Sequence, residues 1–445
     1  MIRYHARWVL PISRPRIAHG TVGVEQGRIA YVGPRDGAPP GADHELGDAV
    51  LLPGLVNVHT HLELTAFRGY LEHLPFREWI ASLQRAKEGV MTPDTFLDAA
   101  RLGIEEGLRA GITTYADTCD SGAALPAMRD MGVRGVVYQE VFGPAPEACA
   151  QSLAALHDKV NALHAHASPL QRVGVSPHAP YTVSDALFRA VADMARRDAL
   201  PIAVHAAESA AERALVTEGR GPFADALRAR GIPVAPRARS SIELLAQCGV
   251  LDARPLLIHC VHVDAADVER MAAAGCAVAH CPASNAKLGH GVAPLARFRS
   301  AGLRVGLGSD SVASNNRMDV LEEARLALLL HRATSLDSGA PSAGEVLEMA
   351  TLGGARALGM DGEVGSLEVG KAADLAAFAL DGAAGEPVYA PEDALVHAVG
   401  ARSVRLATVA GAELVRDGVV RNVDPALRSR VARTARALAA AASAH

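Results

Sequence analysis

Two histidines near residue 60 have the spacing of a metal-binding pair. His59 and His61 flank Thr60, and residues i and i+2 of an extended chain project to the same side. Paired histidines also occur on solvated strands, so the pair alone is weak evidence. His205 and Asp310 end two further strand-like runs, PIAVH and LRVGLGSD. Three imidazole nitrogens and one carboxylate suit Zn²⁺ or Fe²⁺, with one position open for water.

Eight short apolar runs can position these side chains. The runs alternate with helix-length amphipathic segments, which indicates parallel βα units. Six runs end in His, Asp or Glu, and the other two carry His259 or His280 one residue before the end. The C-terminal strand ends of a βα barrel meet at one mouth, where these side chains would gather unless their placement is chance. The runs are residues 55–59, 112–117, 134–140, 172–178, 201–205, 255–260, 276–281 and 303–310.

Both ends of the chain read instead as short strands separated by turns containing Gly and Pro. Neither end can bury both faces of its strands alone, so we expect the two ends to pair. The predicted fold is α/β: a (β/α)₈ TIM-like barrel over residues 54–364, with a small composite β-sandwich and a C-terminal helix from residues 1–53 and 365–445. The Arg-, Gly- and Pro-rich stretch within residues 209–240 is either a lid or a surface excursion.

Composition excludes several classes of protein. The 445 residues are 49% hydrophobic and 21% charged, which is typical of a globular chain and not of a disordered one. The net charge of −5 offers no basic excess for a nucleic-acid polymer or an anionic membrane surface. No apolar run reaches the length of a membrane span, no signal peptide is evident, and the six cysteines form no CxxC pair. We expect a cytoplasmic protein acting on a small molecule.

Several stretches resemble the amidohydrolase superfamily in order and spacing. They are VNVHTHLELTAFRG, SPHAPYTVS, VHAAES, IHCVHVDAADVERMAAAGCAVAHCPASNAKLGHGVAP and GLGSDSVASNN. The resemblance covers nearly the whole chain and is closest to the aminohydrolase branch, which includes adenosine, guanine and aminodeoxyfutalosine deaminases and triazine chlorohydrolases. It implies a metal-dependent hydrolytic deaminase of an amino-substituted heterocycle, such as a purine nucleoside or an aminodeoxyfutalosine-like derivative. Metal-bound hydroxide would attack the amine-bearing carbon, and ammonia would leave.

The resemblance also implies a metal site. Its ligands would be His59, His61, His205 and Asp310. Binuclear members of the superfamily use a carboxylated lysine at the end of the fourth strand, where this chain has Pro177 and His178. None of the four lysines is near that position. We therefore expect one divalent metal, with Zn²⁺ favoured over Fe²⁺. Relatives are often dimers, so a homodimer is expected.

The resemblance assigns catalytic and substrate-binding roles as well. Glu208 would transfer protons, His259 would polarise or orient the water at the metal, and Asp310 would steer that water. Glu208 lies three residues after His205, and the alternative for it is a solvated carboxylate at a helix start. His178 and Ser314 would hold the substrate.

Some assignments have competing interpretations. His262 competes with His259 for the role at the sixth strand. Glu63 in HTHLE resembles the aminodeoxyfutalosine-type group, and either contacts the substrate or holds a loop. Glu140 either lines the pocket or forms a salt bridge, and Trp79 is either core or part of the pocket.

Two other functions compete with deamination. One is hydrolysis of another C–N or a C–Cl bond, as in chlorohydrolases or imidazolonepropionase-like enzymes, and ammonia release discriminates it from deamination. The other is a non-catalytic barrel module, which is disfavoured because such modules lose metal ligands and none is lost here.

Overall fold

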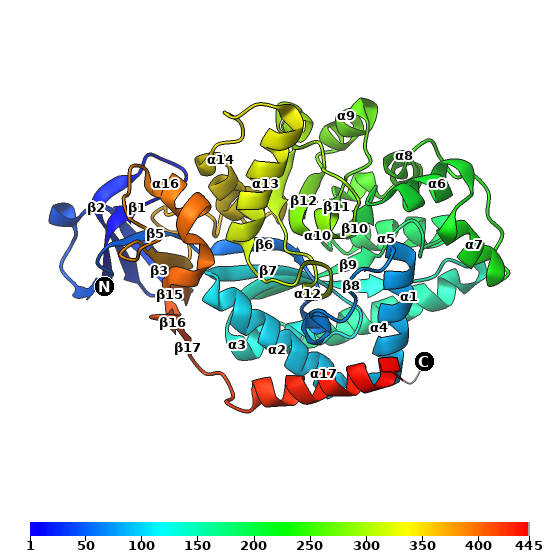
Figure 1. Ribbon diagram of the computed structural model, residues 1–445, viewed down its shortest axis with the longest axis horizontal. Helices are drawn as coiled ribbons and strands as arrows, with labels where there is room; N and C mark the ends of the chain where they lie inside the picture. The colour runs from blue at the N-terminus through cyan, green and yellow to red at the C-terminus, as the bar shows by residue number, and fades with distance from the viewer. Residues whose placement is uncertain (444–445) are drawn as a thin grey trace.

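The computed structural model describes residues 1–443, so the expected segment 365–445 ends outside the described part. The structure has α/β content with a parallel central region, which confirms the predicted class. Figure 1 shows strands from the two ends of the chain side by side at the left and the helices packed around the remainder.

The central region contains all eight predicted strands. They form two four-stranded parallel sheets of mostly apolar, buried residues, as expected for strands covered on both faces. Val175 and Ile202 form a bridge between the sheets at one edge, and at the other the Asp310 N–H donates to the His59 carbonyl at 2.9 Å. The strands are β6 (Leu55–Thr60), β7 (Ile112–Cys119), β8 (Arg134–Val141) and β9 (Gln171–Pro177) in one sheet, and β10 (Ala203–Ala206), β11 (Leu256–His259), β12 (Ala277–His280) and β13 (Arg304–Leu307) in the other.

The two chain ends build one nine-stranded sheet. Hydrogen bonds join all nine strands into one sheet. The strands from the two ends of the chain meet where β14 pairs antiparallel with β5. Buried residues such as Tyr4, Ile29 and Leu375 form its core. The strands are β1 (Ile2–Val9), β2 (Ile17–Glu25), β3 (Arg28–Pro34), β4 (Ala42–Glu45), β5 (Ala49–Pro53), β14 (Leu375–Ala379), β15 (Val404–Val409), β16 (Ala412–Arg416) and β17 (Val419–Val420).

Helices surround the central strands, and capping side chains mark where several begin. Ser209 accepts the hydrogen bond that caps one helix, and Asp319 does the same for another. The α-helices are α1 (Phe76–Val90), α2 (Pro93–Arg109), α3 (Ala124–Met131), α4 (Cys149–His166), α5 (Asp185–Arg197), α6 (Ala210–Glu218), α7 (Pro222–Ala229), α8 (Ser241–Gln247), α9 (Ala265–Ala273), α10 (Pro282–Lys287), α11 (Leu295–Ser300), α12 (Val312–Asn315), α13 (Val320–Ser335), α14 (Ala343–Glu348), α15 (Gly354–Ala357), α16 (Pro391–Asp393) and α17 (Leu427–Ser443).

The C-terminal helix α17 lies on the central region, although the sequence grouped it with the β unit. It runs beneath α2 and reaches α1 (Figure 1). Leu427 and Val431 are buried in a cluster that includes Trp79 of α1, and Arg430 donates to Asp98 of α2 at 2.7 Å. The helix therefore packs against α1 and α2 of the central region.

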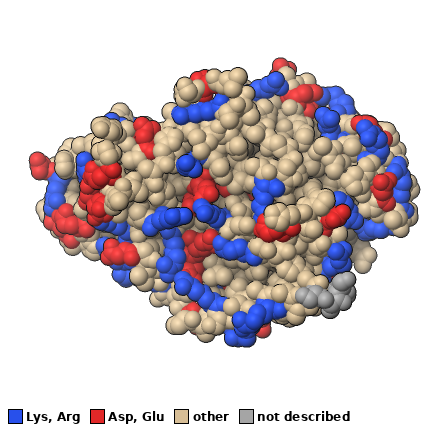
Figure 2. Space-filling view, viewed as in Figure 1, with Lys and Arg blue, Asp and Glu red and all other residues tan. Residues whose placement is uncertain are grey.

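The surface carries no single sign of charge on the face viewed in Figure 2, where basic and acidic side chains alternate. Within residues 1–443, no helix combines the length and apolar character needed to span a bilayer.

Candidate metal and active site

The structure brings the predicted metal ligands together at the C-terminal ends of their strands. Candidate ligand atoms of His59, His61 and His205 all lie within 4.8 Å of one another. Asp310 Oδ1 lies 3.3 Å from His59 Nε2 and 3.7 Å from His61 Nε2. The four side chains come from β6 and the residue after it, from β10 and from the turn after β13, so parallel strand ends gather residues distant in sequence.

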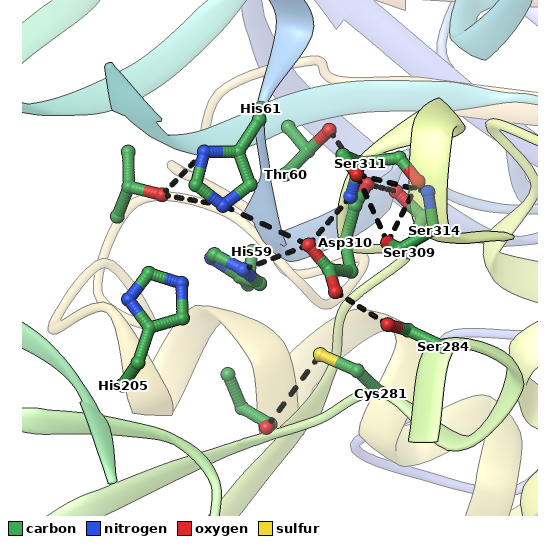
Figure 3. A network of polar contacts seen from close by, with 12 residues as sticks. His59, Thr60, His61, His205, Cys281, Ser284, Ser309, Asp310, Ser311 and Ser314 are labelled. Carbon is green, nitrogen blue, oxygen red and sulfur yellow. Dashed lines mark hydrogen bonds and ion pairs between the residues drawn. The ribbon is translucent and has the colours of Figure 1, made fainter. Parts of the chain in front are cut away.

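Asp310 is held by a network of polar groups (Figure 3). The Ser284 hydroxyl donates to Oδ2, and the Ser311 N–H donates to Oδ1 at 2.6 Å. Thr60, between the two histidines, donates its hydroxyl to the Asp310 carbonyl at 3.1 Å. The first two bonds fix the orientation of the carboxylate, and the third holds the backbone of Asp310.

Close backbone packing also shapes this cluster. A Cβ at Gly308 would lie 2.9 Å from the Cβ of His59 and 3.0 Å from its backbone nitrogen, so a larger residue would push β13 away from β6. Asp310 itself has φ of 58°, and His259 has φ of 73°. Such left-handed conformations of non-glycine residues are uncommon and cluster at functional sites.

The chemistry of the donor set fits a divalent metal. His59 Nε2 is buried and makes no hydrogen bond of acceptable geometry within residues 1–443. Burial lowers the pKa of His61 to about 3, and burial with neighbouring imidazoles holds the pKa of His205 well below its ordinary value. The imidazoles are therefore neutral, which is the form that binds a metal. The His178 carbonyl lies 3.1 Å from His205 Nδ1 and can fix the tautomer that leaves Nε2 for the metal.

Glu208 lies beside this cluster with only 3% of its surface exposed. Its Oε1 lies 3.6 Å from His259 Nε2 and 3.3 Å from His290 Nε2, and Tyr181 donates its hydroxyl to Oε2 at 3.3 Å. Burial alone would raise the pKa of Glu208, but His259 and His290 outweigh burial and lower it. The alternative of a solvated helix-start carboxylate does not fit this geometry.

His259 connects Glu208 with the predicted metal ligands. Its Nε2 lies 4.0 Å from Asp310 Oδ2, and its Nδ1 lies 2.9 Å from Asn285 Oδ1. Its competitor His262 is half-buried and does not line the cavity described below. The structure therefore favours His259 for the role at β11.

A cavity of about 380 Å³ opens in front of these residues. His178 and Ser314, the predicted substrate-binding residues, both line it. His178 Nδ1 lies 2.8 Å from the Thr182 hydroxyl, and Ser314 exchanges hydrogen bonds with Ser311. Trp79 and Glu140, whose placement the sequence left open, line the cavity as well.

Glu63, for which the sequence leaves open a substrate contact or a loop-holding role, lies away from the cavity. It is 1% exposed and does not line the cavity. Its Oε1 pairs with Lys87 Nζ at 3.0 Å, and its Oε2 accepts from the Ser121 N–H at 3.1 Å and from the Ser121 hydroxyl. The carboxylate is thus occupied within the protein, and the alternative of a loop-holding residue agrees with the structure.

The stretch 209–240 contributes to the cavity wall. Arg230, directly after α7, lines the cavity, and Phe223 of α7 stacks on Tyr181 with ring centroids 4.2 Å apart. This stretch is therefore more than a surface excursion.

Sequence reasoning missed His290 and Tyr181, which both contact Glu208. His290 lies in a loop between two glycines, and Tyr181 follows a proline. No strand end or metal-ligand spacing marks either position, so only the folded chain identifies them.

Sequence comparison identifies the family. The profile of the Amidohydrolase family matches residues 50–416. The chain is 35% identical over 428 residues to a 5-methylthioadenosine/S-adenosylhomocysteine deaminase of Nitratidesulfovibrio vulgaris (strain DP4), covering 93% of this chain and 90% of the relative. A deaminase of the same name from Desulforudis audaxviator (strain MP104C) is 34% identical over 438 residues and covers 97% of both chains.

Solved structures agree in fold. An adenosine deaminase from Xanthomonas campestris with bound zinc has a TM-score of 0.87 and 29% identity, covering 99% of this chain and 98% of that one. A zinc complex of atrazine chlorohydrolase from Arthrobacter aurescens TC1 has a TM-score of 0.83 and 26% identity, covering 98% and 100%. The aminofutalosine deaminase of Helicobacter pylori, at 22% identity, shares the fold with a TM-score of 0.81, covering 93% and 100%. The chain therefore belongs to the amidohydrolase family, as its motifs predicted.

Proposed function

We propose that this amidohydrolase is a hydrolytic deaminase of purine nucleosides substituted at the 5′ position, dependent on one Zn²⁺ ion, with its eight central strands forming a (β/α)₈ barrel. The observation that carries the proposal is the position of His259, whose Nε2 lies between the Glu208 and Asp310 carboxylates at 3.6 and 4.0 Å. A proton carrier, a polarising imidazole and a candidate metal ligand thus face the same space. The names of the relatives point to the substrate class.

The residues around the candidate metal site have separate roles in the proposed deamination. His59, His61, His205 and Asp310 would hold the metal, which when bound would lower the pKa of water to about 7 and so supply a nucleophile at neutral pH. Glu208 takes a proton from the attacking water and delivers it to a ring nitrogen. Asp310 accepts a hydrogen bond that orients the water, and His259 donates one to the oxygen as it bonds to the amine-bearing carbon. Glu208 then takes the proton of the added hydroxyl and passes it to the amine, and as the carbon–oxygen double bond forms, the carbon–nitrogen bond breaks and ammonia leaves.

The cavity suits a purine nucleoside in size and lining. Its volume of about 380 Å³ lies within the range of roughly 300 to 1,000 Å³ of small-molecule sites. Phe76, Trp79 and Tyr181 supply aromatic walls for a flat heterocycle. His178 and Ser314 offer polar contacts between these walls and the metal ligands.

The same residues support a single metal ion. The end of β9 carries Pro177 and His178, so it offers no lysine for a second metal. Lys87 reaches the region, but its ammonium group pairs with Glu63. The four proposed ligands thus form one site, and this strand end offers no lysine to bridge a second metal.

The test is an assay of ammonia release with protein of measured metal content. 5′-Methylthioadenosine, S-adenosylhomocysteine, adenosine and aminodeoxyfutalosine are compared, with Glu208→Gln as the inactive control. We expect ammonia from at least one of the 5′-substituted nucleosides. A chlorinated triazine is assayed in parallel, and chloride release without ammonia from any nucleoside would contradict the proposal.

A further inference from the structure

Glu212, on the first turn of α6, is completely buried although it touches none of the predicted metal ligands through its side-chain hydrogen bonds. It lies on the helix that follows β10, the strand that carries His205, and it follows Glu208 by four residues. A buried carboxylate is costly unless its oxygens are hydrogen-bonded. The partners of Glu212 therefore indicate what it does.

The carboxylate of Glu212 holds the backbone that carries Glu208. The Ala207 N–H donates to Oε1 at 2.8 Å, and the Glu208 N–H donates to Oε2 at 3.0 Å. The Ser241 hydroxyl of α8 donates to Oε1 as well. Each oxygen thus binds one of two successive backbone amides, and Ser241 connects the arrangement to the next helix.

This pattern differs from ordinary helix capping. The residue at this position of a capping box reaches back to the backbone N–H of the N-cap residue. The N-cap of α6 is Ser209, whose side chain accepts from the Glu212 N–H. The Glu212 carboxylate instead accepts from the backbone N–H groups of the two residues before the N-cap, which lie in the turn between β10 and α6.

The turn needs such support because its backbone is strained. Ala207 has φ of 52°, a left-handed conformation that a residue with a Cβ adopts at a cost of roughly 1 to 3 kcal/mol. Relaxation of this peptide would rotate the next residue, Glu208, away from its partners. The Glu208 carboxylate must lie within hydrogen-bonding distance of the group whose proton it carries, and a misplacement of about 1 Å can cost 10²-fold in rate.

We propose that Glu212 is a positioning residue that fixes the strained Ala207–Glu208 turn and thereby aims the Glu208 carboxylate at the reacting water and ring nitrogen. This inference rests on the proposed proton-transfer role of Glu208. Gln at position 212 keeps the size of the side chain but replaces one acceptor oxygen by an NH₂ donor facing a backbone N–H. One of the two amides then loses its acceptor.

The experiment compares Glu212→Gln with a matched control. Asp267→Asn alters another buried carboxylate on the first turn of a helix, α9, where it accepts from the Ser240 hydroxyl at 2.6 Å. We expect Glu212→Gln to lower kcat by about 10- to 100-fold, with KM within about threefold and metal content unchanged. Amide hydrogen exchange in the peptide spanning 203–209 should accelerate. Asp267→Asn should leave kcat within about twofold of the wild type.

A double-variant cycle separates positioning from a general structural effect. If Glu212 acts through Glu208, then Glu212→Gln should change kcat by less than about twofold in a Glu208→Gln background. An equal loss in both backgrounds, a loss of metal, or a loss confined to KM would overturn the proposal. If Glu212→Gln does not fold, Ser241→Ala provides the test, with a smaller kcat loss that also disappears in the Glu208→Gln background; an unchanged kcat would overturn it.

Wild-type turnover distinguishes this inference from the proposed function. No ammonia release by the wild type from any purine nucleoside contradicts the proposed function. Ammonia release by the wild type with unchanged kcat in Glu212→Gln contradicts only the role of Glu212.

Discussion

His290 Nε2 lies 3.3 Å from Glu208 Oε1, and both side chains are buried. The imidazole ring packs edge-on against Phe76 of α1, with ring centroids 4.5 Å apart. Phe76, which lines the cavity, thus packs against the His290 imidazole, which in turn contacts the Glu208 carboxylate that we propose carries protons. This contact helps to lower the pKa of Glu208 despite its burial, which keeps the carboxylate able to accept a proton.

Removing His290 should raise the pH below which kcat/KM declines. His290→Phe keeps a ring against Phe76 but removes the imidazole that lies 3.3 Å from Glu208 Oε1 and favours ionised Glu208, so the pKa of Glu208 should rise. A base with a raised pKa becomes protonated at higher pH, and the acid limb of the kcat/KM profile should move upward by about one unit. Profiles of the wild type and variant check this. An acid limb that stays in place would show that His290 does not tune Glu208.

Metal content should depend on Asp310. Elemental analysis of protein purified without added metal should give about one divalent ion per chain. Asp310→Ala should lose this ion with its circular dichroism retained, because packing of the strands does not depend on a residue after the strand end. Ser314→Ala, which changes a cavity residue without a ligand role, should keep the metal. A reproducible ratio near two, with both ions needed for turnover, would contradict the single site.

Glu140 should limit activity at alkaline pH. Burial raises the pKa of Glu140 to about 8, although Lys87 opposes the shift. Glu140 is therefore a neutral acid at pH 7 and becomes negatively charged as pH rises through about 8. The charge removes a hydrogen-bond donor from the cavity and draws water into it, so kcat/KM should fall over that range. Glu140→Gln stays neutral and should show a shallower alkaline limb. Identical limbs in both proteins would exclude this residue.

The buried pair of Lys87 and Glu63 should contribute to stability. Lys87→Met leaves the buried Glu63 carboxylate without its ammonium partner. Loss of one member of a buried pair typically costs about 3 to 5 kcal/mol. Lys159→Met removes an exposed ion pair to Asp120 and should cost less than about 1 kcal/mol. Urea unfolding of the three proteins measures both values. Equal midpoints for the two variants would show that the pair with Glu63 adds nothing.

The central strands can be predicted from the sequence because each is marked by a pattern of neighbouring residues. Each strand is a short apolar run, and parallel packing brings the C-terminal ends together, so His59, His205 and Asp310 could be placed before any contact was known. Strand ends do not specify which partner a side chain meets. Glu63 illustrates this limit, because its partner Lys87 lies 24 residues away on α1.

The remaining features depend on packing that local patterns do not encode. α17 has the composition of a surface helix, and only its apolar contacts with α1 and α2 assign it to the central region. His290 reaches Glu208 from a glycine-flanked loop whose conformation has no sequence signature. The same holds for Arg230, which lines the cavity because the excursion after α7 folds toward it.

Variants of Glu208 and His178 should separate an effect on the chemical step from an effect on substrate binding. Glu208→Gln keeps the size of the side chain but cannot accept the proton of water, so metal content should stay unchanged while kcat falls by about 10² to 10⁴-fold. His178 lines the cavity and has its Nδ1 next to the Thr182 hydroxyl. His178→Ala should therefore mainly raise KM. Steady-state kinetics on the nucleoside that turns over fastest, with metal content measured in each preparation, separates the two effects. If Glu208→Gln with full metal occupancy retained more than about a tenth of the wild-type kcat, the proton-transfer role would be wrong, since even weak general acid–base catalysis contributes about 10²-fold.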